Sequence, residues 1–167
     1  MKEIGVIGGG SWGTALAILL NENGYQVTLW CHSEKSAQNL QKTRSLPEKL
    51  PGIQISEKIR ITASMEEAVS GKEILVVVVP SACVRETAEK MKPFIHRGVK
   101  VVSASKGIEE DTLLTMSEGL EEVLPGIESA VLSGPSHAEE VARSLPTACV
   151  VGAHREETAK ELQSDFM

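Results

Sequence analysis

The chain has 167 residues, 41% of them hydrophobic and 3% aromatic, so it is long enough for one well-buried domain with an aliphatic core. Its 17 basic and 23 acidic residues give a formal charge of −6 and include no basic run, which excludes nucleic acid as a partner. The apolar start is broken by glycines and has neither a basic leader nor a span of roughly 18 apolar residues. We therefore expect a cytoplasmic protein with no membrane attachment.

Predicted strands and helices alternate along the chain. Apolar, β-branched runs predict strands over 2–8, 25–30, 58–62, 73–79, 100–105, 128–134 and 147–153. Helical spacing and capping residues predict helices over 11–24, 33–42, 64–71, 81–94, 111–124 and 154–167. The run at 73–79 is apolar on both faces, which is typical of a central strand in a parallel sheet. This pattern predicts an α/β fold with a doubly wound, mostly parallel sheet and helices on both faces.

A glycine-rich turn joins the first strand to the first helix. Gly8, Gly10 and Gly13 have the spacing GxGxxG. Gly8 would permit the tight turn, Gly10 would let a pyrophosphate approach the backbone, and Gly13 would let the helix pack closely. The helix N-terminus would face the phosphate charge. The motif predicts a Rossmann-type dinucleotide site, with a turn that binds nothing as the alternative.

The residues after the second strand bear on the choice of cofactor. An acid there favours NAD, because it accepts a hydrogen bond from the ribose 2′-hydroxyl and repels the 2′-phosphate of NADP. This chain has Cys31, His32 and Ser33 instead. His32 can donate to a phosphate, and Lys35 follows one helical turn later. We predict NADP, and NAD stays open if His32 is only a solvated loop residue.

The cysteines and histidines give no sign of a metal site. Cys31, Cys83 and Cys149 are far apart and form no CxxC pair, so we expect no disulfide framework and no metal, and three buried or partly buried thiols. His137 has no partner at ligand spacing.

Four segments together resemble the bacterial NAD(P)-dependent glycerol-3-phosphate dehydrogenases. They are the glycine turn with Trp12, "VVVVPS" at 76–81, "SKGIE" at 105–109 and "SGPSHAEEVARSLPTA" at 133–148. The last segment is the most specific, and the resemblance covers essentially the whole chain. In one departure, His137 stands where the family usually has Phe.

The resemblance implies a set of site residues. Those implied to contact the cofactor are Gly8, Gly10, Ser11, Trp12, Gly13, His32, Lys106 and Ala138. Those implied to contact the substrate are Lys106, Gly134 and Ser136. Lys106 follows the fifth predicted strand and Gly134 the sixth, at the carboxyl ends where open α/β sheets bind ligands. Pro135 would fix a turn there, and Ser136 would also cap a following helix.

The resemblance also implies an activity. It is hydride transfer between NAD(P)H and dihydroxyacetone phosphate or sn-glycerol 3-phosphate, which feeds glycerophospholipid synthesis. A second, helical domain of the family supplies the lysine that transfers the proton, and nothing in the chain matches that domain. We therefore expect residues 1–167 to be the cofactor-binding domain alone, inactive by itself, and the alternative is a complete short protein. A homodimer stays open for the full-length protein.

Two other functions remain open from the residues themselves. Another NADP-dependent reductase of the superfamily, acting on a hydroxy acid or sugar acid, would share the glycine turn and the sheet. A dinucleotide-sensing module without catalysis would share them too, but such modules usually keep the ribose-binding acid that this chain lacks.

Overall fold

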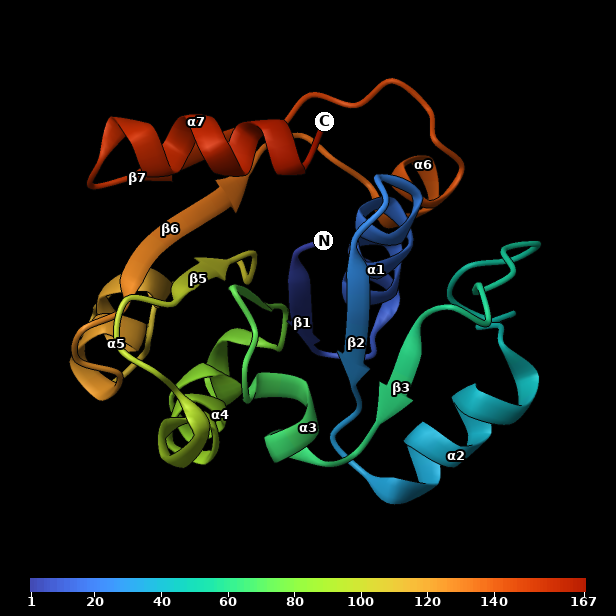
Figure 1. Cartoon of the computed structure of the whole chain (residues 1–167), viewed down its shortest axis with the longest axis horizontal. Coiled ribbons are helices and arrows are strands. Elements are labelled where there is room, and N and C mark those ends of the chain that lie inside the picture. Colours follow the sequence, from blue (N-terminus) through green and yellow to red (C-terminus); the bar gives the residue numbers. More distant parts are fainter.

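A single seven-stranded sheet organises the computed structural model, which describes all residues from 1 to 167 (Figure 1). The strand order is β3-β2-β1-β4-β5-β6-β7, and every neighbouring pair is parallel except β6 and β7. The strands are β1 (Glu3–Ile7), β2 (Gln26–Trp30), β3 (Arg60–Thr62), β4 (Ile74–Val77), β5 (Lys100–Ser103), β6 (Glu128–Ser133) and β7 (Val150–Ala153). The doubly wound, mostly parallel sheet that the sequence predicts is confirmed.

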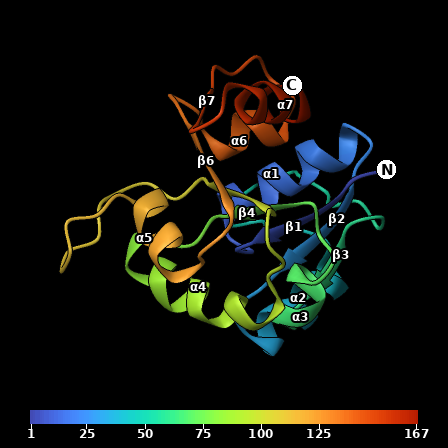
Figure 2. The same cartoon turned by 60° about the vertical axis from the view of Figure 1, so that its left-hand side comes forward.

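Helices cover both faces of the sheet. They are α1 (Ser11–Glu22), α2 (Glu34–Thr43), α3 (Met65–Val69), α4 (Val84–Met91), α5 (Met116–Val123), α6 (Ala138–Ala142) and α7 (Glu156–Asp165). In Figure 2, α1, α6 and α7 lie on one side of the sheet and α3, α4 and α5 on the other. No helix is long and apolar enough to cross a membrane.

Two large aliphatic clusters, one on each face, form most of the core, and a third, small cluster lies between α1 and α6. Leu16 of α1 and Leu162 of α7 belong to the cluster on one face, and Ala88 of α4 and Leu120 of α5 belong to the other. Strand β4 is buried along its whole length between β1 and β5, as the apolar run at 73–79 predicts. This burial leaves the loops at the carboxyl ends of β1 and β4 as the place where polar groups can gather.

Side-chain caps explain where several helices begin. The Ser33 hydroxyl accepts from the Ser36 N–H at 3.2 Å at the start of α2, and the Ser64 hydroxyl accepts from the Glu67 N–H at 3.3 Å at the start of α3. Both caps were predicted, although Glu67 does not complete the box by bonding back to Ser64. Each cap satisfies one of the free N–H groups of a helix's first turn.

Three helix predictions need correction. Helix α5 begins at Met116 and not at residue 111, because Leu113 has φ 60° and a reciprocal capping box between Thr115 and Glu118 starts the helix. Ser136 does not cap α6, whose N-cap residue is His137. The predicted helix 81–94 is α4 with a short 3₁₀ turn at each end, Ser81–Cys83 and Lys92–Phe94.

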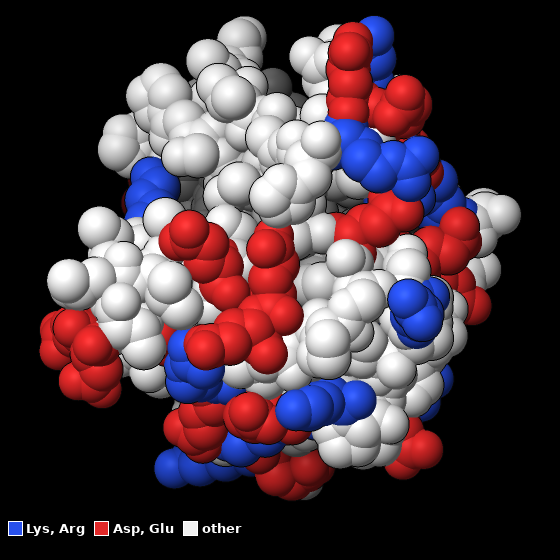
Figure 3. Space-filling model, turned by 90° about the vertical axis from the view of Figure 1, so that its left-hand side faces the viewer, with Lys and Arg blue, Asp and Glu red and all other residues white.

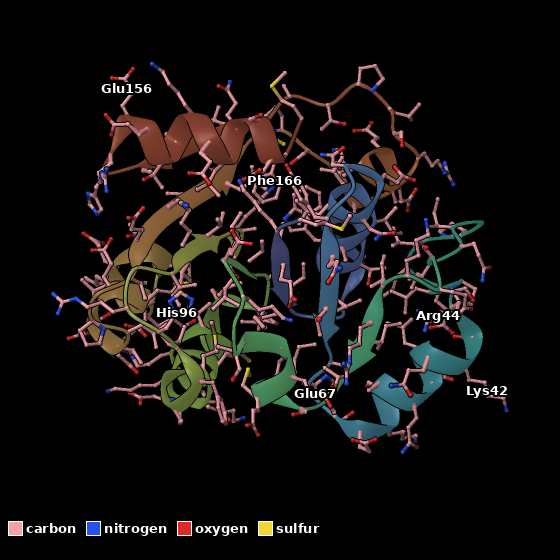
Figure 4. The ribbon with its side chains drawn as sticks, viewed as in Figure 1. Lys42, Arg44, Glu67, His96, Glu156 and Phe166 are labelled. Atoms are coloured by element: carbon pink, nitrogen blue, oxygen red, sulfur yellow. The ribbon has the colours of Figure 1, made fainter.

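The irregular segment 44–59 is held against the end of α2. Arg44, which has φ 48°, donates from Nη1 to the carbonyls of Ser56 at 3.1 Å and Ile59 at 2.7 Å. Figure 4 labels Arg44 where α2 meets this segment. The fold-back brings residues 46–50 towards the carboxyl end of β2, next to the candidate site.

Charged side chains are mixed on the surface. Figure 3 shows one face, where Lys and Arg lie among Asp and Glu and form no continuous basic area.

Candidate functional site

The glycine turn follows β1 at the centre of the sheet. Gly8 has φ 138°, and a Cβ there would lie 2.1 Å from the carbonyl oxygen of Val78. Its N–H donates to the carbonyl of Trp30 at 3.2 Å. The turn is therefore wedged between the ends of β2 and β4, and only glycine fits at this position.

The other two glycines of the motif shape the start of α1. A Cβ on Gly13 would lie 1.9 Å from the Gly8 carbonyl oxygen, so α1 packs directly on the turn. A Cβ on Gly10 would meet nothing within 4 Å. Gly10 is the N-cap of α1 and provides no side-chain cap, which leaves the first N–H groups of the helix for another acceptor. This open cradle fits a diphosphate.

The first of two cavities at this end of the sheet has a volume of about 380 Å³, a size typical of small-molecule sites. We call it the Lys106 pocket. Residues of the glycine turn, the ends of β4 and β5, and the start of α6 line it, among them Gly10, Ser11, Trp12, Gly13, Val78, Lys106, Ser136 and Ala138. Lys106 is its one Lys, Arg, Asp or Glu residue. A cation at the edge of a mostly uncharged pocket suits an anionic or developing negative group.

Lys106 is exposed, but the backbone on either side of it is fixed. The Ser105 hydroxyl donates to the carbonyl of Val79 at 2.7 Å and accepts from its N–H at 3.1 Å. Gly107 has φ 121°, and a Cβ there would lie 3.1 Å from the Cβ of Ser81. These contacts hold Lys106 next to the residues that follow β4.

The second cavity, of about 600 Å³, lies on the other side of the glycine turn, since Gly8, Gly9 and Gly10 line it together with Cys31 and His32. We call it the Cys31 pocket. It is also lined by Asn39 of α2, Lys49 of the segment 44–59, and Cys83, Glu86, Thr87 and Lys90 of the β4–β5 crossover. The two pockets share Gly10, Val78 and Val79, so an extended ligand can occupy both across the glycine turn.

The Cys31 pocket has no acid at the end of β2. Burial raises the pKa of the Cys31 thiol to about 11, so the thiol is neutral at physiological pH. His32 and Lys49 are both exposed at the pocket. Lys90 forms an ion pair with Glu86 at 2.6 Å, which partly neutralises its charge. The pocket can therefore accept a phosphate without repulsion from an acid after β2.

Most of the predicted site residues meet at these two pockets. Gly134 does not line either of them. It has φ 141°, and a Cβ there would lie 2.8 Å from the Ala148 carbonyl oxygen, so this glycine shapes the turn before Ser136. Lys35, expected near the phosphate of the cofactor, does not line the Cys31 pocket. Cys83 and Cys149 are exposed and not buried or half-buried as expected.

Sequence reasoning missed Lys49 and Lys90. Lys90 lies near the carboxyl end of α4, on the exposed face of a helix that was predicted, and no sequence motif places its side chain at the pocket. Lys49 lies in a segment without periodicity, where no sequence pattern gives a position.

Comparison with known proteins identifies the family of this chain. Residues 3–159 match the family described as the NAD-dependent glycerol-3-phosphate dehydrogenase N-terminus. The chain belongs to this family. A relative from Fusobacterium nucleatum, named glycerol-3-phosphate dehydrogenase [NAD(P)+], is 47% identical over 169 residues, and one of the same name from Agathobacter rectalis is 44% identical over 167. Each alignment covers 100% of this chain and 50% of the relative, so the chain spans about half the length of these dehydrogenases.

Solved structures of the family have the same fold. The glycerol-3-phosphate dehydrogenase of Coxiella burnetii superimposes with a TM-score of 0.92 at 30% identity, over 99% of this chain and 51% of that one. A structure from Dunaliella salina gives a TM-score of 0.87 over 99% of this chain and 32% of that one, but at 22% identity it supports the fold alone. The resemblance seen in the four sequence segments is confirmed at the level of family and fold.

Proposed function

We propose that this chain is the cofactor-binding part of an enzyme that transfers hydride between NADP(H) and the C2 position of dihydroxyacetone phosphate or sn-glycerol 3-phosphate. One observation carries the proposal: the open cradle at the N-terminus of α1 and the Lys106 ammonium border the same pocket. Family membership supports this choice of substrate, because the relatives are named glycerol-3-phosphate dehydrogenases.

Each pocket has a distinct part in binding the cofactor. The free N–H groups at the start of α1 bind the diphosphate, and the helix dipole favours its charge. The Cys31 pocket receives the adenosine end, with His32 at its ribose. The Lys106 pocket receives the nicotinamide, with Ser11, Trp12 and Ala138 around it. When bound, the nicotinamide supplies or accepts the hydride.

The substrate is bound beside the same pocket. Lys106 donates hydrogen bonds to the substrate oxygen and stabilises the alkoxide charge that develops there. Ser136 and the turn at Gly134 position the substrate from the β6 side. Holding both reactants in one geometry lowers the barrier by removing the entropy cost of their encounter.

The charges of the Cys31 pocket favour NADP over NAD. No acid lies at the end of β2, and the raised pKa keeps the Cys31 thiol uncharged. Glu86 is the one acid that lines the pocket, and it is paired with Lys90. His32 and Lys49 can both donate to that phosphate. NAD still fits, because its 2′-hydroxyl can bond to His32.

The remaining parts of the proposal concern the full-length enzyme. Residues 1–167 form the cofactor domain, and the rest of the enzyme supplies the proton-transferring lysine and most of the contacts to the substrate phosphate. The length of the relatives supports this division. We place the enzyme in the cytoplasm, as a homodimer whose product feeds glycerophospholipid synthesis.

The test is steady-state reduction of dihydroxyacetone phosphate by the full-length enzyme with NADPH. Lys106→Ala should raise KM and lower kcat by roughly 10²-fold, because it removes a charge that acts in both the bound and the transition state. Lys42→Ala is the matched control, since Lys42 is an exposed lysine of α2 that lines neither pocket, and it should leave both constants unchanged. A kcat/KM within about twofold of wild type in Lys106→Ala would show that Lys106 does not contact the substrate.

The same assay separates the rival functions. Turnover of hydroxy acids or sugar acids in preference to dihydroxyacetone phosphate would favour another reductase of the superfamily. Tight NADPH binding by the full-length protein without turnover of any of these compounds would favour a sensing module.

A further inference from the structure

The loop that carries Lys106 has little apolar packing of its own. It runs from Lys106 to Thr115 and folds back on itself, with Glu109 N–H donating to the Leu114 carbonyl at 2.9 Å and an isolated antiparallel bridge between Ile108 and Thr115. The side chains of Ile108 and Leu113 are 58% and 77% exposed. Burial of apolar surface therefore does not fix this loop, and its position depends on polar contacts.

One side-chain contact ties the far side of the loop to a helix. Arg85 of α4 donates from Nε to Glu109 Oε1 at 2.7 Å and from Nη2 to Glu109 Oε2 at 2.9 Å. Thr112, within the same loop, also donates to the Glu109 carboxylate. The Glu109 side chain is only 18% exposed. A two-pronged arginine–carboxylate pair fixes orientation as well as distance.

Arg85 has a second acidic partner that offers a comparison. Its Nη2 donates to Glu122 Oε2 at 2.5 Å, but this contact is single, goes to α5 and involves a side chain that is 57% exposed. Isolated surface ion pairs contribute little to stability. The two ion pairs of Arg85 connect different elements. The pair with Glu122 joins α4 and α5, which are already packed together, and the pair with Glu109 joins α4 to the loop.

Two sets of hydrogen bonds hold the chain on either side of Lys106. Ser105, one residue before it, is bonded to the backbone of Val79. Glu109, three residues after it, is bonded to Arg85. With both ends held, the Lys106 backbone stays at the edge of the Lys106 pocket.

We propose that Arg85 and Glu109 are positioning residues, which hold the loop 106–115 so that the Lys106 ammonium stays where it meets the substrate. The inference rests on the proposed function, because it assigns the pair a role only through Lys106. Without the pair, Lys106 would keep its charge and lose its fixed position. Misplacement of a catalytic group by about 1 Å can cost as much as 10²-fold in rate.

The test uses the full-length enzyme with dihydroxyacetone phosphate and NADPH. Glu109→Gln keeps the size of the side chain and removes its charge, and it should lower kcat/KM by about tenfold or more. NADPH affinity should stay within about twofold of wild type, because neither Glu109 nor Arg85 lines the two pockets. Glu122→Gln, which removes the other partner of the same arginine, is the matched control and should leave kcat/KM unchanged.

A double variant separates positioning from a general structural effect. If Glu109 acts through Lys106, adding Glu109→Gln to Lys106→Ala should cause no further loss, because the group it positions is already gone. Arg85→Lys keeps the charge but not the two-pronged geometry, and its kcat/KM should lie between those of wild type and Arg85→Gln. These α4 variants give the same test if Glu109→Gln does not fold.

Three outcomes would overturn the inference. They are wild-type kcat/KM in Glu109→Gln, an equal loss in Glu122→Gln, and a full further loss in the double variant. Each of them leaves the proposed function intact, because the wild-type enzyme is active in all three. An inactive wild-type enzyme, in contrast, would reject the proposed function and the inference with it.

Discussion

Replacing Gly8 with alanine tests the packing of the glycine turn without reference to any ligand. The added Cβ would lie 2.1 Å from the Val78 carbonyl oxygen, at a backbone φ of 138° that side chains rarely adopt. Ordinary van der Waals contact begins at 3.4 Å. The turn and the end of β4 would therefore have to separate by about 1.3 Å, which strains the buried strand at the centre of the sheet.

The expected loss of stability follows from two costs. Overpacking costs about 1–3 kcal/mol and the left-handed backbone about 1–3 kcal/mol more, so the free energy of unfolding should fall by roughly 2–6 kcal/mol. For a domain of this size each kcal/mol corresponds to about 2–4 °C, so Tm should fall by roughly 4–24 °C. Thermal and urea unfolding followed by circular dichroism would measure both values.

Gly10→Ala is the matched control for this prediction. A Cβ on Gly10 meets no atom within 4 Å and the residue has φ −77°, so the unfolding free energy should change by less than about 1 kcal/mol. NADPH affinity should nevertheless fall, because the new methyl group occupies the space in front of α1. A Gly8→Ala variant as stable as wild type would refute the packing argument, and wild-type NADPH affinity in Gly10→Ala would refute the position of the diphosphate.

Two further predictions concern the Cys31 pocket. At pH 8 iodoacetamide should label Cys83 and Cys149 but not Cys31 in the folded protein. Cys31 is buried, and with a pKa of about 11 only about 0.1% of its thiol is ionised. NADPH should slow the labelling of Cys83, which lines the pocket, and not that of Cys149. Mass spectrometry gives the result, and rapid labelling of Cys31 would contradict it. His32→Glu should shift the preference from NADPH towards NADH, because the acid repels the 2′-phosphate; unchanged relative kcat/KM for the two cofactors would place the phosphate elsewhere.

The positions of the strands along the chain and the class of the sheet could be predicted from sequence because they depend on local pattern. Apolar runs place the strands, and the right-handed crossover rule places the helices on both faces. The start of α5 could not be predicted in this way, because the helical pattern continues through 111–115. The left-handed Leu113 and the Thr115 cap override it.

Part of the candidate site could be predicted from sequence and part could not. The glycine turn was predictable because steric contact at Gly8 and Gly13 leaves a strict spacing in the sequence. Lys49 was not, since it reaches the Cys31 pocket through the fold-back that Arg44 holds, which depends on contacts between distant residues. The tether between Arg85 and Glu109 was missed for the same reason: the two residues come from different elements and share no motif.

Titration of the 167-residue chain with NADPH, followed by nucleotide fluorescence, shows whether this chain binds the cofactor by itself. We expect saturable binding of one NADPH per chain and no oxidation of it when dihydroxyacetone phosphate is added. Gly10→Asp, which brings a side chain and a negative charge into the space in front of α1, should abolish that binding in a folded chain. A folded wild-type chain that does not bind NADPH, or a Gly10→Asp chain that binds it equally well, would show that the glycine turn is not the cofactor site.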